Sequence, residues 1–175
     1  PRVTIYSDPT EGELFTAPFN SEGLPNRRMV WIEDGVLRNL VYDRFWAWRS
    51  GVSPTGFPSG YAMRGGNSSI DEMIASTERG LLVTRFWYMR PVDPRTVLYT
   101  GLTRDGTFLV ENGRIAGAVK NLRWNESPAL LLRELEGIGA PVRVSPSESG
   151  DLGPAVRVPP IKARGFTFSS ISDAI

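Results

Sequence analysis

Two Asx-Gly pairs, each set between apolar arms, limit most strongly how this chain can fold. The pairs are Asp34-Gly35 and Asn112-Gly113. Both central residues of a two-residue type I′ turn need positive φ, which Asp, Asn and Gly accept readily. The arms predicted around them are residues 28–33 and 36–42 for the first turn, and residues 107–111 and 114–118 for the second. The sequence therefore predicts two antiparallel hairpins.

Two segments between these hairpins favour helices. Residues 43–49, with three aromatic side chains, predict a short helix directly after the first hairpin. Further along, Ser69 and Glu72 have the spacing of a capping box, in which each residue satisfies a backbone N–H of the other. Gly80 follows at a position typical of a helix end. The second helix is therefore expected to begin after Ser69 and to end before Gly80.

A third helix is predicted after the second hairpin. Ser127-Pro128 puts Ser at the N-cap and Pro at the first helical position. Leu130, Leu131 and Leu135 are expected to form its buried face, and Gly137 is expected to end it.

The remaining apolar runs predict strands. They cover residues 3–6, 81–89, 97–103, 119–123, 142–144, 156–158 and 161–168. The run 81–89 is continuously apolar and aromatic, which is typical of a central strand, and Pro91 and Pro94 are expected to end it. Residues 104–106 are expected to turn the chain. The fold class predicted is α+β, with predominantly antiparallel β-sheets and two or three short helices, in one domain over residues 1–175.

The two hairpins also align with each other. Residues 31–37 match residues 109–115 at an offset of 78, and the same offset pairs Trp46 with Trp124. Shared turn chemistry alone explains two similar hairpins. A constant offset as far as the tryptophans instead suggests an internal duplication, with hairpin units at residues 27–46 and 105–124. That hypothesis predicts two equivalent sheets.

Composition excludes several kinds of chemistry. The 175 residues contain no His and no Cys. A His- or Cys-ligated zinc, a Ser-His-Asp triad and a CxxC redox pair are therefore excluded within this chain. An all-carboxylate metal site, a Ser-Lys pair and a Thr nucleophile stay open. The formal net charge of +1 argues against direct nucleic-acid binding, and no apolar run approaches the ~18 residues of a membrane span.

One segment mixes aromatic and cationic side chains. Residues 85–90 read Arg-Phe-Trp-Tyr-Met-Arg. Stacking of bases on these rings is one interpretation. A strand whose aromatic residues alternate between faces is the other, and the near-zero net charge favours it. The carboxylates, Asp105 among them, are expected to be exposed or to cap helices.

An ordered set of motifs along nearly the whole chain resembles the C-terminal half of the TldD/PmbA family, known as modulators of DNA gyrase and as TldD-type metallopeptidases. The motifs are Glu22-Gly23-Leu24-Pro25, residues 31–37, Tyr42-Asp43-Arg44, Asn67, residues 80–88, Val92-Asp93-Pro94-Arg95-Thr96, residues 102–108, Glu111-Asn112-Gly113, Val119-Lys120-Asn121, Asn125-Glu126-Ser127-Pro128 and residues 166–170.

The resemblance implies a β-rich C-terminal domain of a longer cytoplasmic protein. In peptidase members an HExxxH helix binds zinc, and its Glu is the general base. That motif is not in this chain, nor is the Cys ligand that some members carry. No catalytic residue, metal ligand or cofactor is therefore assigned here, and whether the protein is an enzyme is left open. Zinc is expected only in the full-length catalytic members, and the missing Cys favours the non-catalytic partner subunit.

The resemblance also implies partners. Family members form homo- or heterodimers that enclose a cavity for unfolded peptide, so this chain is expected to contribute cavity wall and dimer interface. Strand addition to an exposed sheet edge suits such a substrate. Arg85, Trp87, Arg90 and Arg104 are the predicted substrate-binding residues. The alternative is a non-catalytic interaction module that binds gyrase or toxin–antitoxin proteins.

Overall fold

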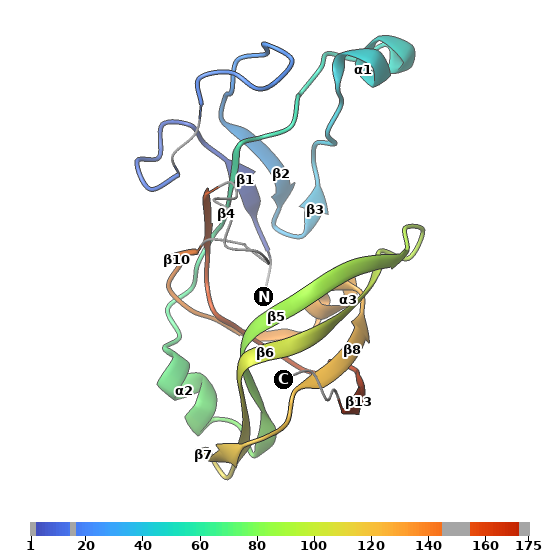
Figure 1. Ribbon diagram of the computed structural model, residues 1–175. Coiled ribbons are helices and arrows are strands. Elements are labelled where there is room, and N and C mark those ends of the chain that lie inside the picture. Colours follow the sequence, from blue (N-terminus) through green and yellow to red (C-terminus); the bar gives the residue numbers. More distant parts are fainter. Residues whose placement is uncertain (1–2, 15–16, 145–154, 172–175) are drawn as a thin grey trace. The chain divides into compact units, whose positions relative to one another are not determined.

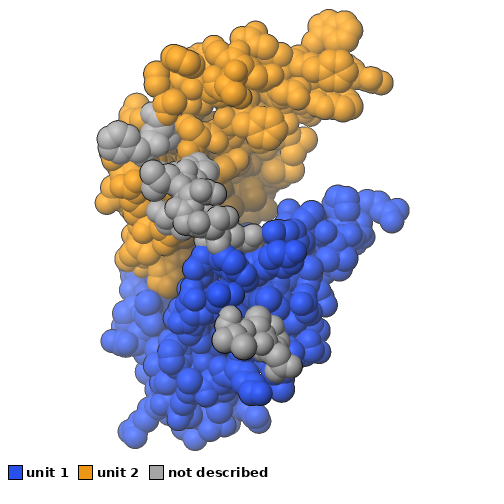
Figure 2. Space-filling view, viewed as in Figure 1, with its two compact units in different colours: residues 1, 67–139, 161–175 blue, residues 2–66, 140–160 orange. Residues whose placement is uncertain are grey.

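The computed structural model describes residues 3–14, 17–144 and 155–171. The chain divides into two compact units, which are coloured separately in Figure 2. One unit comprises residues 2–66 and 140–160, and the other comprises residue 1 with residues 67–139 and 161–175. Each unit is built from segments distant in sequence. Whether the two behave as one domain stays a prediction.

The unit that contains residues 2–66 is built on a six-stranded sheet in the order β10-β11-β4-β1-β2-β3. Its strands are β1 (Ile5–Ser7), β2 (Met29–Glu33), β3 (Val36–Leu37), β4 (Gly60–Met63), β10 (Val142–Val144) and β11 (Ala155–Val158). All neighbours are antiparallel except β11 and β4. Trp31 lies in the core, and its indole N–H donates to Ser7 Oγ at 3.2 Å. Residues 145–154, between β10 and β11, lie outside the described residues.

Helix α1 (Arg44–Ser50) follows the first hairpin, as predicted. Asp43 caps it by accepting from the Trp46 N–H at 2.6 Å, and Gly51 at φ 67° ends it. The predicted turn at Asp34-Gly35 is also confirmed, with φ of 50° and 82°. The second arm of that hairpin pairs only over Val36–Leu37, which is shorter than the predicted arm.

The other unit is dominated by a long hairpin, drawn green to yellow in Figure 1. It consists of β5 (Arg79–Asp93) and β6 (Leu98–Glu111), in a sheet ordered β13-β8-β6-β5 with β7 also on β6. The remaining elements are α2 (Ile70–Ala75), β7 (Arg114–Ala118), β8 (Leu122–Glu126), α3 (Pro128–Arg133), β9 (Leu135–Ile138), β12 (Ile161–Ala163) and β13 (Phe168–Ile171). β9 and β12 form a separate two-stranded sheet. The α+β class with mainly antiparallel sheets and three short helices is confirmed.

The strand predictions for β5 and β6 need correction. β5 is an edge strand of its sheet rather than a central one, and it continues through Pro91 to Asp93. An edge strand tolerates Pro because an N–H on its outer side would have no neighbouring strand to donate to, so its loss costs no hydrogen bond. Residues 104–106 do not turn the chain, because β6 runs through them. The late strand predicted over 161–168 is divided into β12 and β13, with Gly165 at φ 71° between them.

The helix ends were also predicted wrongly. α2 has the predicted capping box but ends at Ala75, and Gly80 lies in β5. α3 ends at Arg133, and Gly137 lies in β9 with the buried Leu135. In both places the glycine expected to end the helix belongs instead to a strand that pairs with another strand.

Ser127 occupies the predicted N-cap of α3 without capping it. Its hydroxyl instead donates to the Thr96 carbonyl at 3.0 Å. Leu130, predicted on the buried face, is 50% exposed. None of the helices in the described part of the chain is long and apolar enough to cross a membrane.

The predicted duplication fails beyond the hairpins. Both turns are present, since Asn112 and Gly113 have φ of 49° and 75°. Trp46, however, lies on α1 and is 54% exposed, whereas Trp124 lies on β8 and is 4% exposed. The two tryptophans occupy unrelated places, so turn chemistry alone explains the repeat.

Candidate functional site

Three of the four predicted substrate-binding residues come together on one face of the β5–β6 hairpin. Arg85 and Arg104 are direct cross-strand partners, and Trp87 lies two residues beyond Arg85 on the same face. The guanidinium carbons of both arginines lie 4.8 Å from the Trp87 ring centroid. Cation–π attraction therefore holds both cations against one indole. We call Arg85, Trp87, Arg104 and Asp105 the arginine–tryptophan cluster.

Asp105 completes this cluster, and sequence reasoning missed its role. Its carboxylate lies 2.7 Å from Arg85 Nη1 and 3.7 Å from Arg104 Nε. Like charges on direct cross-strand partners repel each other, and the carboxylate between the two arginines offsets that repulsion. Asp105-Gly106 predicted only a turn. In the structure two β6 residues oppose Thr84 alone, and the resulting bulge puts Asp105 at φ 64°.

The opposite face of the hairpin anchors it to its unit. Phe86, between Arg85 and Trp87, stacks on Phe166 with centroids 5.3 Å apart and meets Trp124 edge-on at 5.1 Å. Phe168 extends the group, 5.0 Å from Phe166. Such aromatic contacts add to the free energy gained by burial. They fix which face of β5 points away from the core, and thereby the placement of the cluster.

Arg90, the fourth predicted residue, lies beyond a second bulge in β5. Trp87 pairs with Leu102 and Arg90 with Thr100, so Tyr88 and Met89 oppose Gly101 alone. Tyr88 has φ 53°, an unfavourable conformation for a bulky residue. The Arg90 guanidinium lies 4.1 Å from the Tyr88 ring centroid. Arg90 therefore belongs to a neighbouring arginine–aromatic pair rather than to the cluster.

β5 carries both features on a strand whose second edge no described strand covers. Among the described strands it pairs only with β6, over the fifteen residues Arg79–Asp93. An edge strand offers N–H and C=O groups to any chain that lies beside it. Bulges along β5–β6 interrupt its register at three places, and such interruptions discourage indiscriminate pairing of an edge.

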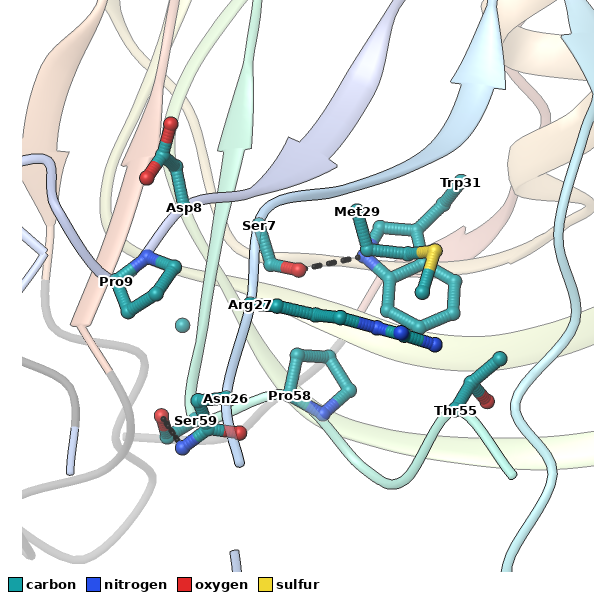
Figure 3. Close-up of a pocket in the computed structure, with 11 residues that line it drawn as sticks. Ser7, Asp8, Pro9, Asn26, Arg27, Met29, Trp31, Thr55, Pro58 and Ser59 are labelled. Carbon is teal, nitrogen blue, oxygen red and sulfur yellow. Dashed lines mark hydrogen bonds between the residues drawn. The ribbon is translucent and has the colours of Figure 1, made fainter. Parts of the chain in front are cut away.

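A small pocket lies in the unit that contains residues 2–66 (Figure 3). Ser7, Asn26, Arg27, Trp31 and Ser59 are among its lining residues, and Figure 3 shows the extended Arg27 side chain between Trp31 and Pro58. Asn26 Nδ2 donates to Ser59 Oγ at 3.1 Å. The enclosed space is about 10 Å³, which holds about one water molecule. A peptide side chain does not fit there.

Asp8 at the rim of this pocket has a lowered pKa. The Thr10 hydroxyl and N–H donate to one carboxylate oxygen at 2.7 and 2.9 Å, and Arg28 lies 3.4 Å from the other. These bonds stabilise the charged form. Burial raises the pKa of the Tyr61 phenol and, with help from Glu11, that of the Tyr6 phenol.

The donor set of the chain does not suit a zinc site. Zinc in proteins takes three or four ligands from Cys, His, Asp and Glu. The sequence has no His or Cys, and no group of three carboxylates gathers among the described residues. No hydrolytic step is therefore assigned to these side chains.

Residues 1–170 match the family model of the PmbA/TldA metallopeptidase C-terminal domain. A metalloprotease of Methanothermobacter thermautotrophicus is 25% identical over 89% of this chain and 37% of its own length. A TldD-homologous metalloprotease of Haemophilus influenzae is 31% identical over 69% of this chain and 27% of its own length. The chain thus spans well under half the length of these relatives.

Solved structures share the fold. A protein of Bacteroides thetaiotaomicron, proposed to modulate DNA gyrase, superposes with a TM-score of 0.78 and 26% identity, over 97% of this chain and 37% of that one. TldE of Thermococcus kodakarensis superposes with a TM-score of 0.75 and 21% identity, over 97% and 39% of the two chains. The chain therefore belongs to the family of PmbA/TldA metallopeptidase C-terminal domains.

Proposed function

We propose that this chain is the peptide-binding, non-catalytic part of a metallopeptidase assembly, and that unfolded peptide pairs with the edge of β5 that no described strand covers. The fifteen-residue edge of β5 that no other described strand covers is the observation that carries the proposal. Main-chain hydrogen bonds supply affinity in strand addition, and alternate side chains supply specificity. The cluster lies on this strand, so Arg85, Trp87 and Arg104 are proposed to meet the side chains of the bound peptide.

Backbone methylation of a peptide tests strand addition. Every second N–H of an added strand points toward its neighbour. We expect a fluorescent extended peptide to bind the intact chain. Binding should be lost when the residues whose N–H groups face β5, which are every second residue, are N-methylated. The matched control is the same peptide with N-methyl groups on the residues whose N–H groups point away from β5, because the N–H groups that face β5 then stay free to donate. Equal binding of both methylated peptides contradicts strand addition.

The second part of the proposal is assembly with a paired TldD/PmbA-type subunit, as a homo- or heterodimer. Exposed apolar side chains around α1 support it. Phe45, Trp46 and Trp48 are 55%, 54% and 79% exposed. Contiguous exposed apolar surface is typical of an interaction site. We expect sedimentation velocity to show a concentration-dependent dimer that the double substitution W46S/W48S weakens. A dimer unchanged by that substitution contradicts an interface at α1.

In this assembly zinc and its general base are supplied by residues other than the described ones, and a cytoplasmic location stays a prediction. We expect elemental analysis of the purified chain to give less than about one zinc per ten chains. Stoichiometric zinc that survives dialysis contradicts a non-catalytic role.

An interaction module that binds gyrase or a toxin–antitoxin protein is the alternative. Similar structures from Bacteroides thetaiotaomicron and Thermotoga maritima, described as proposed gyrase modulators, favour its gyrase form. Binding of folded gyrase in the absence of any peptide binding selects this alternative. Peptide binding without gyrase binding excludes its gyrase form.

A further inference from the structure

We propose that Asn112 is a deamidation site, and that docking of its turn on residues 76–78, the segment that follows α2, sets the rate of the reaction. Asn112-Gly113 is the only Asn-Gly pair in the sequence, and it forms the turn between β6 and β7. Glycine has no side chain to shield its amide nitrogen, so an asparagine that precedes glycine is especially prone to deamidation. The modification does not depend on the proposed binding of peptide.

The reaction is intramolecular and needs only water as a co-reactant. The Gly113 nitrogen attacks the side-chain carbonyl carbon of Asn112 and forms a C–N bond. The side-chain amide of Asn112 leaves as ammonia and takes the proton of the Gly113 N–H with it. Water then opens the resulting succinimide at either carbonyl, which leaves Asp or isoaspartate at residue 112. Asn112 is exposed, so water has access to its side chain.

In the folded chain the attacking nitrogen is held by another group. The Gly113 N–H donates to the Thr77 carbonyl at 2.9 Å, and the neighbouring Asn112 N–H donates to the Glu78 carbonyl at 2.7 Å. The fit is close, because a Cβ built on Gly113 would lie 2.7 Å from the Ala75 carbonyl oxygen. α2 and β7 lie side by side in Figure 1. The nitrogen must leave Thr77 before it can attack the Asn112 side chain, so the docked turn is unreactive.

The stability of α2 therefore determines how often the turn opens. Thr77 is tied to the helix, because its hydroxyl donates to the Met73 carbonyl at 2.7 Å. The helix has only six residues and begins at the Ser69 cap. At its other end the Lys162 ammonium donates to the Ser76 carbonyl at 2.9 Å and to the Ser76 hydroxyl at 3.0 Å. Loss of the contacts at either end should favour local opening of the turn.

Peptide mapping by mass spectrometry tests the inference on the intact chain. In mildly alkaline buffer, the rate of deamidation at Asn112 is measured in the folded chain and in a urea concentration that unfolds it. Because the reaction requires local opening, we expect the folded chain to react at least about ten-fold more slowly. Hydrogen exchange of the Gly113 N–H, followed by NMR, is the second readout, and it should be slow in the folded chain.

Two variants loosen α2 from opposite ends. S69A removes the N-cap and should speed deamidation about five-fold. K162Q removes the two hydrogen bonds to Ser76 and should speed it about three-fold or more, and it keeps the test valid should S69A unfold the chain. The matched controls are S68A, beside the cap, and K120Q, which makes the same charge change at an exposed lysine. Both controls should leave the rate unchanged.

Four results would overturn the inference. An unmodified Asn112 in the unfolded chain shows that it is not a deamidation site. Equal rates in the folded and unfolded chains exclude protection by docking. Wild-type rates in both S69A and K162Q, with each variant folded by circular dichroism, exclude control by α2. Acceleration by K120Q as large as that by K162Q assigns the effect to surface charge instead.

Discussion

Gly101 lies opposite Trp124 in the sheet, where there is no room for a side chain. A Cβ built on Gly101 meets the Trp124 ring at 2.5 Å. Trp124 is 4% exposed and packs against Phe86 and Phe166, so it cannot move away freely. We expect G101A to lower the free energy of unfolding by about 1–3 kcal/mol, the usual effect of overpacking a core, in a urea titration.

Gly117 supplies the matched control for this prediction. It lies in the exposed strand β7, and a Cβ there meets nothing within 4 Å. G117A should therefore change the free energy of unfolding by less than about 0.5 kcal/mol. Equal destabilisation by the two substitutions contradicts the proposed contact with Trp124.

Asp8 predicts a pH-dependent contribution to stability. Its pKa is lowered from 3.8 by the Thr10 hydrogen bonds, so it binds its proton less tightly in the folded chain than in the unfolded one. The stabilisation is therefore complete above the unfolded pKa and disappears as pH falls through the folded pKa. We expect D8N to cost about 0.5–1 kcal/mol at pH 7 and nothing at pH 2, in urea titrations at both pH values. A cost that is the same at pH 2 contradicts an ionised role for Asp8.

Individual turn residues could be predicted only where the local chemistry decides the outcome. Asp34-Gly35 and Asn112-Gly113 adopt positive φ in hairpins, as expected. Asp105-Gly106 has the same composition, and Asp105 also has positive φ, yet the chain does not reverse there. Positive φ suits a bulge as well as a turn. Only the pairing with distant strands distinguishes the two, so the position of Asp105 in the cluster could not be predicted.

The capping box makes α2 depend on single side chains. Ser69 Oγ accepts from the Glu72 N–H at 3.1 Å, and Glu72 accepts in return from the Ser69 N–H at 2.8 Å. α2 has only six residues, so it has few internal bonds to compensate for the loss of a cap. We expect S69A to lower the free energy of unfolding by about 1 kcal/mol in a urea titration.

The adjacent Ser68 is the control. It lies outside the capping box, and its backbone N–H donates to Ile138 instead. S68A should change the free energy of unfolding by less than about 0.5 kcal/mol. If S68A costs as much as S69A, the loss reflects the local chain rather than the cap.

Element starts were predicted better than element ends. Caps and turns are local chemistry: α2 begins directly after its predicted N-cap Ser69, and α1 begins at Arg44, one residue after its predicted start. The glycines expected to end α2 and α3 lie instead in β5 and β9. Those helices stop earlier because the following residues pair with β6 and β12, and such distant pairing leaves no local signal.

At the scale of the whole chain, fold class and family could be predicted, but the place of β5 in its sheet could not. A continuous apolar and aromatic run is typical of a strand covered on both sides. β5 is instead apolar because Phe86 on one face packs on Phe166, and Trp87 on the other face contacts the guanidinium groups of Arg85 and Arg104. Three of the four predicted site residues are neighbours there for the same reason, since pairing with β6 brings Arg104 to Arg85.

The central claim is that β5 binds extended peptide at the edge that no described strand covers, and hydrogen exchange on the intact chain tests it most directly. With a saturating extended peptide, we predict slower exchange within residues 79–93 and unchanged exchange in the hairpin of β2 and β3. Added strand bonds protect the amides of β5 that do not already face β6. Unchanged exchange in β5 while the peptide is bound, or protection confined to other strands, contradicts the claim.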